Sequence, residues 1–227
     1  MSFYMTNLPI LYSFRRCPYA MRARIAIKLC KIKVELREVL LKKIPVEMSE
    51  ISPKSTVPVL LFPNGKVLEE SIDIMNWAFN KKNIDYINNS KNKNQETIKT
   101  FITKFDKKFK YHLDRYKYYT RYIAENDIKT PEYHREECLK ILFEIETLLE
   151  SNSLWLFDNK PSYLDIAILP FVRQYRIADM NWFDNEMPLS NIREWLNRFL
   201  VWDTFKKIMI KNPLWEDSQT KIYFGQD

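Results

Sequence analysis

Between a predicted strand and a predicted helix lies the stretch Arg15-Arg16-Cys17-Pro18-Tyr19-Ala20, which contains a single cysteine. Residues 8–14 form an apolar run typical of a short buried strand, and Pro18 suits the first position of a helix. The helix is indicated by apolar residues at helical spacing: Met21, Ile25, Ala26 and Leu29. Cys17 is therefore predicted to stand at the N-cap of this helix.

A thiol in that position differs chemically from an ordinary cysteine. Unpaired backbone N–H groups and the helix dipole favour an anion there, and they lower the pKa of a thiol from about 8.5 toward roughly 3.5–7.5. Four arginines add positive charge nearby: Arg15, Arg16, Arg22 and Arg24. The pattern favours a reactive thiolate, and a buried, inert cysteine is the alternative.

The composition is that of a folded chain with a substantial core. Its 227 residues are 46% apolar and 15% aromatic, enough for one large domain or two small ones and unlike a disordered or collagen-like chain. Only two glycines occur, Gly65 and Gly225, so the chain contains neither a P-loop motif nor a dinucleotide-binding fingerprint, both of which need closely spaced glycines. Nucleotide binding through glycine-rich loops is thereby excluded.

Cysteine usage and hydropathy bear on location. Three cysteines are an odd number and too few for a disulfide framework, which fits a reducing cytosol. No apolar run approaches the roughly 20 residues of a membrane span. The short apolar stretch near the N-terminus has no basic region before it and is interrupted by Pro9, so no secretory signal is apparent. We therefore expect a cytoplasmic protein with no membrane partner.

The formal net charge of +7 raises the question of nucleic-acid binding. Lys and Arg are scattered along the chain and interleaved with 29 acidic residues, and the densest basic run, within 81–93, is rich in Asn. No aromatic–basic motif of an RNA-binding sheet occurs, nor a basic helix free of acids. Nucleic acid is not expected as a partner, whereas attraction of small anionic substrates is.

Residues 1–82 mix strand and helix signals. Polar and apolar residues alternate over 33–39, as in a half-exposed strand, and a helix-length crossover makes this strand the parallel neighbour of the first. Further signals follow in this order: a short helix near 45–49, strands at 57–62 and 66–69 around the turn Pro63-Asn64-Gly65, and a helix opening at Ser71. The predicted order is β-α-β-α-β-β-α.

The remainder of the chain is predicted to be almost wholly helical. Apolar faces indicate long helices over 98–116 and after Pro131. Ser162-Tyr163-Leu164-Asp165 has the pattern of a capping box, with Asp in place of the usual Glu. The expected organisation is a domain over 1–82, a Lys- and Asn-rich linker over 83–94, and an all-helical domain over 95–227.

Four segments, in this order and spacing, resemble a known family: Cys17-Pro18-Tyr19-Ala20, Val57-Pro58, Glu69-Glu70-Ser71, and the capping box that begins at Ser162. The chain resembles the cytosolic glutathione transferase superfamily over nearly its whole length. It looks most like the cysteine-type members, such as the omega class and bacterial relatives, and its N-terminal half is also similar to the larger glutaredoxins. The resemblance implies an α/β thioredoxin-like N-terminal domain and an all-α C-terminal domain.

The resemblance also implies a glutathione site in the N-terminal half, with Cys17 as the catalytic residue. The glutathione-binding residues would be Pro18, Tyr19, Lys43, Val57, Pro58, Glu70 and Ser71. A cis Val57–Pro58 bond would let the Val57 backbone pair with the tripeptide. Ser71, as a helix N-cap, would receive the γ-glutamyl carboxylate and Glu70 its ammonium. Glutathione would serve as co-substrate, no metal is expected, and family members commonly form homodimers.

One position departs from the family pattern. The lysine that meets the glycyl carboxylate in the family falls, by spacing, at Ile44 of this chain. The neighbouring Lys42 and Lys43 are the residues that could replace it. Without this contact, a lower affinity for glutathione is expected.

The cysteine spacing bears on mechanism. Ala20 stands where a dithiol motif has its second cysteine, and Cys30 lies about 20 Å along the same helix at 1.5 Å per residue, too far to bridge. Cys138 belongs to the helical half. Cys17 is thus predicted to act as a monothiol that attacks a glutathione mixed disulfide and is released by a second glutathione, with ping-pong kinetics.

Other functions remain open at this stage. The fold also supports conjugation of glutathione to electrophiles, and it occurs in non-catalytic binding or regulatory proteins. A form that inserts into membranes would need a long apolar segment, which the sequence lacks.

The helical half contains further candidate residues. His134 and Cys138 have the spacing of a metal-ligand pair but no further ligand nearby, so structural or surface roles are expected for the two histidines, His112 and His134. In the family the long helix contributes to a second-substrate pocket, for which the candidates are Tyr111, His112, Arg115 and Tyr118.

Overall fold

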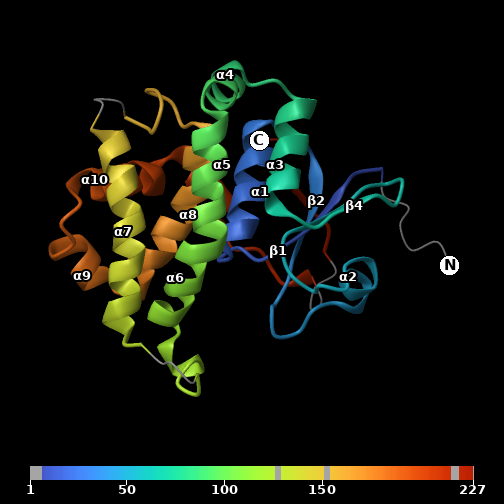
Figure 1. Ribbon diagram of the computed structural model, residues 1–227. Coiled ribbons are helices and arrows are strands. Elements are labelled where there is room, and N and C mark those ends of the chain that lie inside the picture. Colours follow the sequence, from blue (N-terminus) through green and yellow to red (C-terminus); the bar gives the residue numbers. More distant parts are fainter. Residues whose placement is uncertain (1–6, 126–128, 151–153, 216–219, 227) are drawn as a thin grey trace. The chain divides into compact units, whose positions relative to one another are not determined.

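A computed structural model describes residues 7–125, 129–150, 154–215 and 220–226 (Figure 1). It divides into two compact units, one comprising Met1–Ile84 with Trp202–Asp227 and the other Asp85–Val201. The first unit contains the sheet and the second is helical, which confirms the expected fold class.

The first unit follows the predicted order of elements. They are β1 (Ile10–Ser13), α1 (Pro18–Leu29), β2 (Val34–Glu38), α2 (Val46–Ile51), β3 (Val59–Leu61), β4 (Val67–Leu68) and α3 (Ser71–Lys81), joined near the C-terminus by α11 (Asp203–Ile208) and β5 (Ile222–Phe224). The C-terminal strand β5 was not predicted.

The five strands form one sheet in the order β4-β3-β1-β2-β5. β1 is parallel to β2, as predicted, with Leu11 opposite Leu36. β5 pairs antiparallel with β2. Gly225 follows β5 with φ +107, and a Cβ there would lie 2.0 Å from the carbonyl oxygen of Ile32. Only glycine fits this approach, because it lacks a Cβ and tolerates positive φ.

The apolar centre of this unit supports the cysteine segment. Tyr12 of β1, Ala20 of α1 and Met48 of α2 belong to one buried hydrophobic cluster. Cys17 and Ile44 pack against the same cluster. The start of α1 and the short helix α2 are therefore held by a common core.

Strand β2 corrects one prediction. The alternation over 33–39 predicts a half-exposed strand, yet every residue of β2 is buried, including Glu35 and Arg37. These two side chains form an ion pair at 2.8 Å, and the Trp215 ring lies over Arg37. The polar face is buried because the C-terminal segment packs on it, a contact that no local pattern reveals.

The second unit consists of helices. They are α4 (Asp85–Lys93), α5 (Gln95–Lys104), α6 (Lys110–Lys117), α7 (Pro131–Leu149), α8 (Tyr163–Ala178), α9 (Met180–Asn185) and α10 (Ser190–Val201), with a π-helical turn at Phe105–Phe109 and a 3₁₀ turn at Tyr119–Arg121. The π turn joins α5 and α6 into the long helix predicted over 98–116. At the start of α8 the capping box is confirmed, since Ser162 Oγ accepts the N–H of Asp165 and Asp165 Oδ2 accepts the N–H of Ser162.

The observed units differ from the expected domain limits in two places. The segment interpreted as a linker, 83–94, contains helix α4, which buries Ile87 in the helical unit. The segment from Trp202 onward belongs to the first unit instead of the helical domain, because β5 completes the sheet and α11 packs on α1.

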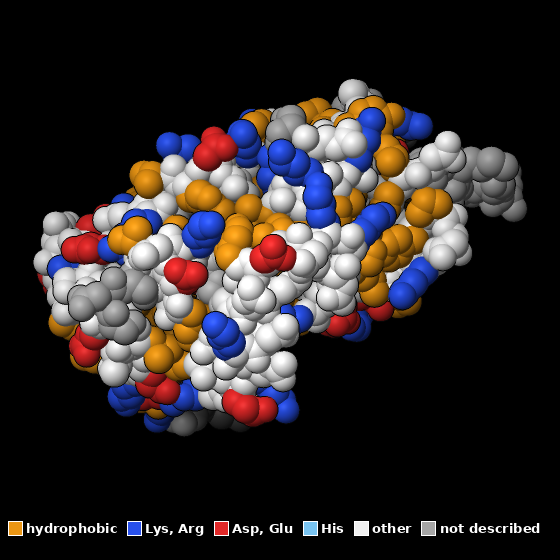
Figure 2. Space-filling view, turned by 90° about the horizontal axis from the view of Figure 1, so that it is seen from above, with side chains coloured by type: hydrophobic (Ala, Val, Ile, Leu, Met, Phe, Trp, Pro, Cys, Tyr) orange, Lys and Arg blue, Asp and Glu red, His pale blue; other side chains and the backbone are white. Residues whose placement is uncertain are grey.

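Figure 2 shows Lys and Arg side chains interspersed with Asp and Glu over the visible face of the molecule. This agrees with the interleaving of charges along the chain. Within the described ranges, no helix is both long and apolar enough to cross a membrane.

Candidate active site around Cys17

Cys17 occupies the predicted position at the start of α1. It is the N-cap residue, with extended backbone (φ −75, ψ 125), and Pro18 is the first helical residue. Its side chain is half-buried, whereas the other two free cysteines, Cys30 and Cys138, are buried. Burial raises the pKa of Cys30 to about 11 and that of Cys138 well above its usual range. Cys17 is therefore the most accessible of the three thiols.

The position of Cys30 agrees with monothiol chemistry at Cys17. Cys30 is the C-cap of α1, so the full length of the helix separates the two sulfur atoms. Its thiol donates instead to the carbonyl of Lys82, with 3.8 Å between the two heavy atoms. The described structure contains no disulfide, and the geometry of α1 forbids one between Cys17 and Cys30.

The Val57–Pro58 segment lies directly against the thiol. Cys17 Sγ is 3.7 Å from the carbonyl oxygen of Val57, and the Val57–Pro58 peptide bond is cis, as the resemblance implies. β3 begins just after this bond, at Val59, and pairs with β1. The central sheet thus brings together two predicted site segments that lie 40 residues apart in sequence.

The start of α3 corrects the predicted cap position of Ser71. Glu70 is the N-cap and Ser71 is the first residue of the helix. The Ser71 hydroxyl is buried and accepts a hydrogen bond from Arg22 Nη1 at 3.3 Å. Arg22 is itself fully buried and lies over the ring of Tyr19. A buried arginine of α1 therefore joins the predicted residues Tyr19 and Ser71, a role that the sequence did not indicate.

Glu70 has an ionic partner that was also not predicted. Lys54 Nζ lies 2.7 Å from Glu70 Oε1, and both side chains are more than half exposed. The preceding residue, Glu69, accepts a hydrogen bond from Ser52 at 2.6 Å. The loop before the cis proline is therefore linked twice to the residues that begin α3.

Ile44, which occupies the position of the family lysine, has a structural role. Ile44 packs against the hydrophobic cluster that also contacts Cys17. Lys43, the predicted substitute, is exposed on the segment that leads into α2, and its backbone N–H donates to the carbonyl of Leu40. Position 43 is thus exposed to solvent, while the side chain at position 44 packs on the core.

Glu38 binds two of the arginines near Cys17, Arg24 and Arg15. Arg24 is fully buried and pairs with Glu38 at 2.5 Å; burial lowers its pKa and Glu38 opposes that effect. The other oxygen of Glu38 accepts the backbone N–H of Arg15 at 2.6 Å. Glu38 therefore fixes the backbone two residues before Cys17, and it neutralises part of the positive charge that the sequence suggested.

The helical unit contains a histidine pair that the sequence analysis missed. His112 and His134 are buried with their Nδ1 atoms 2.8 Å apart. Burial, together with the neighbouring His134, lowers the pKa of His112 to about 4. The side chain of His112, one of the candidates for a second-substrate pocket, is thus buried against His134. In the described part of the chain, no group of three or more His, Cys, Asp or Glu could hold a metal ion.

Arg115, another pocket candidate, is bound by its neighbours. It forms an ion pair with Glu125 at 2.5 Å and lies over the rings of Tyr111 and Tyr122. Tyr118, the last candidate, is exposed and its ring contacts Arg121. These residues form a surface cluster at the end of α6.

Comparisons with known proteins agree with the resemblance seen in the sequence. Residues 11–88 match the family of glutathione S-transferase N-terminal domains, and residues 111–198 match the family of glutathione S-transferase C-terminal domains. The two matches together span most of the chain. The chain therefore belongs to the glutathione S-transferase superfamily.

Individual relatives are more distant. A protein of Aplysia californica named "Probable glutathione transferase" is 41% identical over 58 residues, which are 26% of this chain and 63% of that protein. The match thus spans less than two thirds of that relative. Among solved structures, the trimeric glutathione transferase TDR1 of Leishmania has a TM-score of 0.72 at 20% identity, covering 90% of this chain and 46% of that chain.

Two further structures have similar overlap. Glutathione transferase Omega 3C from Trametes versicolor has a TM-score of 0.72 at 17% identity, covering 94% of this chain and 89% of that one. A family member from Pseudomonas fluorescens, with two glutathione molecules bound, has a TM-score of 0.69 at 17% identity, covering 92% and 94% of the two chains. At these identities the likeness shows the fold.

Proposed function

We propose that this protein is a glutathione-dependent thiol transferase whose nucleophile is Cys17. The observation that carries the proposal is an accessible sulfur at the N-terminus of α1, 3.7 Å from the Val57 carbonyl beside a cis proline. The helix N-terminus stabilises the thiolate. The backbone next to Pro58 offers an extended peptide its main-chain hydrogen bonds close to that sulfur.

Glutathione is proposed to lie along the edge formed by these segments. Its cysteinyl part would lie beside Cys17, Pro18 and Tyr19 and pair with the Val57–Pro58 backbone. The remaining contacts would come from three residues: Glu70 for the γ-glutamyl ammonium, Ser71 at the start of α3 for the γ-glutamyl carboxylate, and Lys43 for the glycyl carboxylate. Because Lys54 already pairs with Glu70, the ammonium of glutathione would either share the Glu70 carboxylate with Lys54 or displace Lys54 from it.

The chemistry is two successive thiol–disulfide exchanges. The Cys17 thiolate attacks the glutathione sulfur of a mixed disulfide; a Cys17–glutathione disulfide forms, and the partner leaves as a thiolate that takes a proton from water. A second glutathione thiolate then attacks the glutathione sulfur of this adduct. Oxidised glutathione leaves and the Cys17 thiolate is restored. The net reaction converts one mixed disulfide and one glutathione into the partner thiol and oxidised glutathione.

The test uses wild type, Cys17→Ser and the control Cys30→Ser. After incubation with oxidised glutathione, intact mass should show one glutathione adduct on wild type and on Cys30→Ser, and none on Cys17→Ser. Reduction of a mixed disulfide should be lost only in Cys17→Ser. An adduct that maps to Cys30 or Cys138 would refute the mechanism.

The same samples separate the alternative functions. Conjugation of glutathione to an electrophile that survives in Cys17→Ser would identify a conjugating glutathione S-transferase. Absence of glutathione binding by wild type would leave a non-catalytic binding or regulatory role. A cytoplasmic homodimer is part of the proposal, and light scattering of the full chain tests the dimer.

A further inference from the structure

Residues 208–215, here called the C-terminal strap, contact two separate elements of the candidate site. The strap begins at the last residue of α11 and lies beside the end of β2, where Leu214 forms a parallel β-bridge with Glu38. Its residues lie more than 160 positions along the chain from the groups that they bind. The strap is therefore a purely tertiary addition to the N-terminal fold.

The first end of the strap holds the cysteine segment. The carbonyl of Ile208 accepts a hydrogen bond from Arg24 Nη1 at 3.2 Å, and the carbonyl of Met209 accepts one from Arg15 Nη1 at 2.9 Å. Arg15 and Arg24 both also bind Glu38. This end thus contributes to the fixed geometry of the residues just before Cys17.

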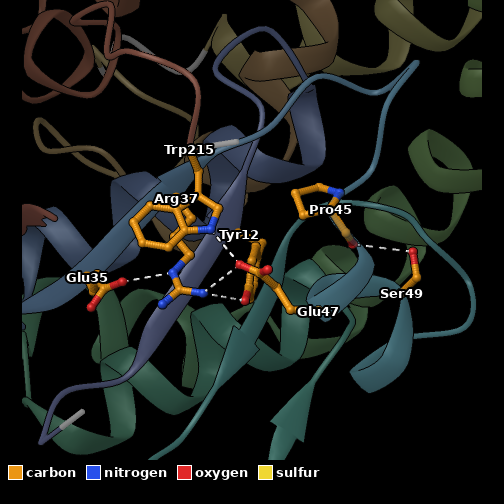
Figure 3. A network of polar contacts seen from close by, with 7 residues as sticks. All are labelled: Tyr12, Glu35, Arg37, Pro45, Glu47, Ser49 and Trp215. Carbon is orange, nitrogen blue, oxygen red and sulfur yellow. Dashed lines mark hydrogen bonds and ion pairs between the residues drawn. The ribbon is translucent and has the colours of Figure 1, made fainter. Parts of the chain in front are cut away.

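The second end of the strap holds α2 through a single side chain. The ring of Trp215 lies 4.0 Å from the guanidinium carbon of Arg37, and its indole N–H donates to Glu47 Oε1 (Figure 3). Arg37 Nη1 binds the same Glu47 oxygen at 3.0 Å and the Tyr12 hydroxyl at 2.8 Å. Its Nε pairs with Glu35. Arg37 therefore packs between the sheet and the Trp215 ring. Arg37 and Trp215 each donate a hydrogen bond to Glu47 of α2.

Helix α2 has few other attachments. It runs only from Val46 to Ile51, its one buried residue is Met48, and no side chain caps its N-terminus. A helix this short is unstable alone and depends on tertiary contacts. Glu47 lies in its first turn, so the bonds from Trp215 and Arg37 act where the chain enters from Lys43. Losing the indole N–H should therefore loosen this end of α2.

We infer that Trp215 is a positioning residue that holds α2 and the Lys43 segment in the conformation that binds glutathione. The inference rests on the proposed function. If Trp215 is altered, a smaller fraction of molecules has α2 docked, and the apparent affinity for glutathione falls by that fraction. The chemistry at Cys17 should be unaffected, because Trp215 binds Arg37 and Glu47, whereas the Cys17 sulfur lies against the Val57 carbonyl.

The test compares Trp215→Phe with the matched control Trp182→Phe. Phe retains an aromatic ring over Arg37 and removes the N–H that binds Glu47. Trp182 also lies over an arginine, Arg135 at 4.3 Å, but in the helical unit. We expect Trp215→Phe to raise the KM for glutathione about three- to tenfold with kcat unchanged, the size of one ordinary hydrogen bond, because Glu47 keeps its bond to Arg37. Amide exchange of residues 46–51 should accelerate in Trp215→Phe alone.

A second variant, Glu47→Gln, keeps an oxygen acceptor and removes the charge, so it should give a smaller rise in KM in the same direction. Unchanged exchange in α2 with unchanged KM would overturn the inference, as would a fall in kcat equal to the rise in KM. Faster exchange without any change in KM would also overturn it, while leaving the proposed function intact. Failure of wild type to bind glutathione would instead overturn the proposed function, and exchange in α2 would still decide whether Trp215 holds the helix.

Discussion

Replacing Asp165 with Ala should destabilise the helical unit severely. The Asp165 carboxylate is completely buried and accepts three N–H groups: the backbone N–H of Ser162 at 2.7 Å, the backbone N–H of Leu156 at 3.1 Å and the indole N–H of Trp195 at 2.6 Å. It thereby joins the start of α8, the segment before it and α10. Burial raises the pKa of Asp165 to about 6, and its hydrogen bonds oppose that shift.

The expected magnitude follows from these three donors. A buried donor that loses its acceptor costs about 1–3 kcal/mol, and the effects of neighbouring bonds do not add fully. We therefore expect Asp165→Ala to lower the free energy of unfolding by about 3–6 kcal/mol, a large share of the roughly 5–15 kcal/mol typical of a whole domain. Asp165→Asn should cost about 1–3 kcal/mol, because one amide oxygen can still accept from Leu156 and Trp195.

Urea unfolding followed by circular dichroism and by tryptophan fluorescence measures these differences. The control is Asp158→Ala. Asp158 is an exposed carboxylate whose Oδ1 accepts the N–H of the adjacent Asn159 at 2.6 Å, and its loss should change the free energy of unfolding by less than about 0.5 kcal/mol. A loss below about 1 kcal/mol for Asp165→Ala would refute the view that this carboxylate organises the helical unit. Equal losses for the Ala and Asn variants would refute the role of the individual hydrogen bonds.

Three further outcomes are expected. Because the pKa of His112 in the folded protein is lowered to about 4, the unfolded chain binds a proton there that the folded chain does not. The free energy of unfolding should therefore fall by about 1–3 kcal/mol between pH 6.5 and 4.5. A fall of the same size in His112→Gln would show that another group causes it. Gly225→Ala should displace β5, since the new Cβ would meet Ile32, and faster amide exchange over 222–224 would reveal it; unchanged exchange would contradict the steric argument. Iodoacetamide should alkylate Cys17 at neutral pH far faster than the buried Cys30 and Cys138. Alkylation of Cys17 no faster than that of the other two thiols would argue against an accessible, reactive sulfur at the start of α1.

Local signals in the sequence were sufficient for the elements that depend on neighbours along the chain. Pro18 after Cys17 predicts the N-terminus of α1, and the structure has Cys17 as the N-cap. The box at Ser162 predicts the start of α8 because both partners lie within one helical turn. The parallel pairing of β1 with β2 follows from the crossover length alone. The cis bond at Pro58 required the family resemblance as well.

Local sequence patterns did not predict which side chains from distant segments contact one another. Ser71 reads as a helix cap, but its hydroxyl is bound by Arg22, which a local pattern assigns only to a helix face. The two histidines lie on separate helices, and only the packing of α6 on α7 makes them a pair. In each case the side chain's partner is selected by geometry across the core.

The class of fold, the order of its elements and the placement of Cys17 follow from the amino-acid sequence, because they depend on periodicity, capping and turn residues within a few positions. The burial of β2 on both faces and the bond from Trp215 to α2 follow from tertiary packing. The physical reason is that a polar strand face such as Glu35 and Arg37 is stable in water or in a buried ion pair alike, and the choice is made by a segment from the far end of the chain.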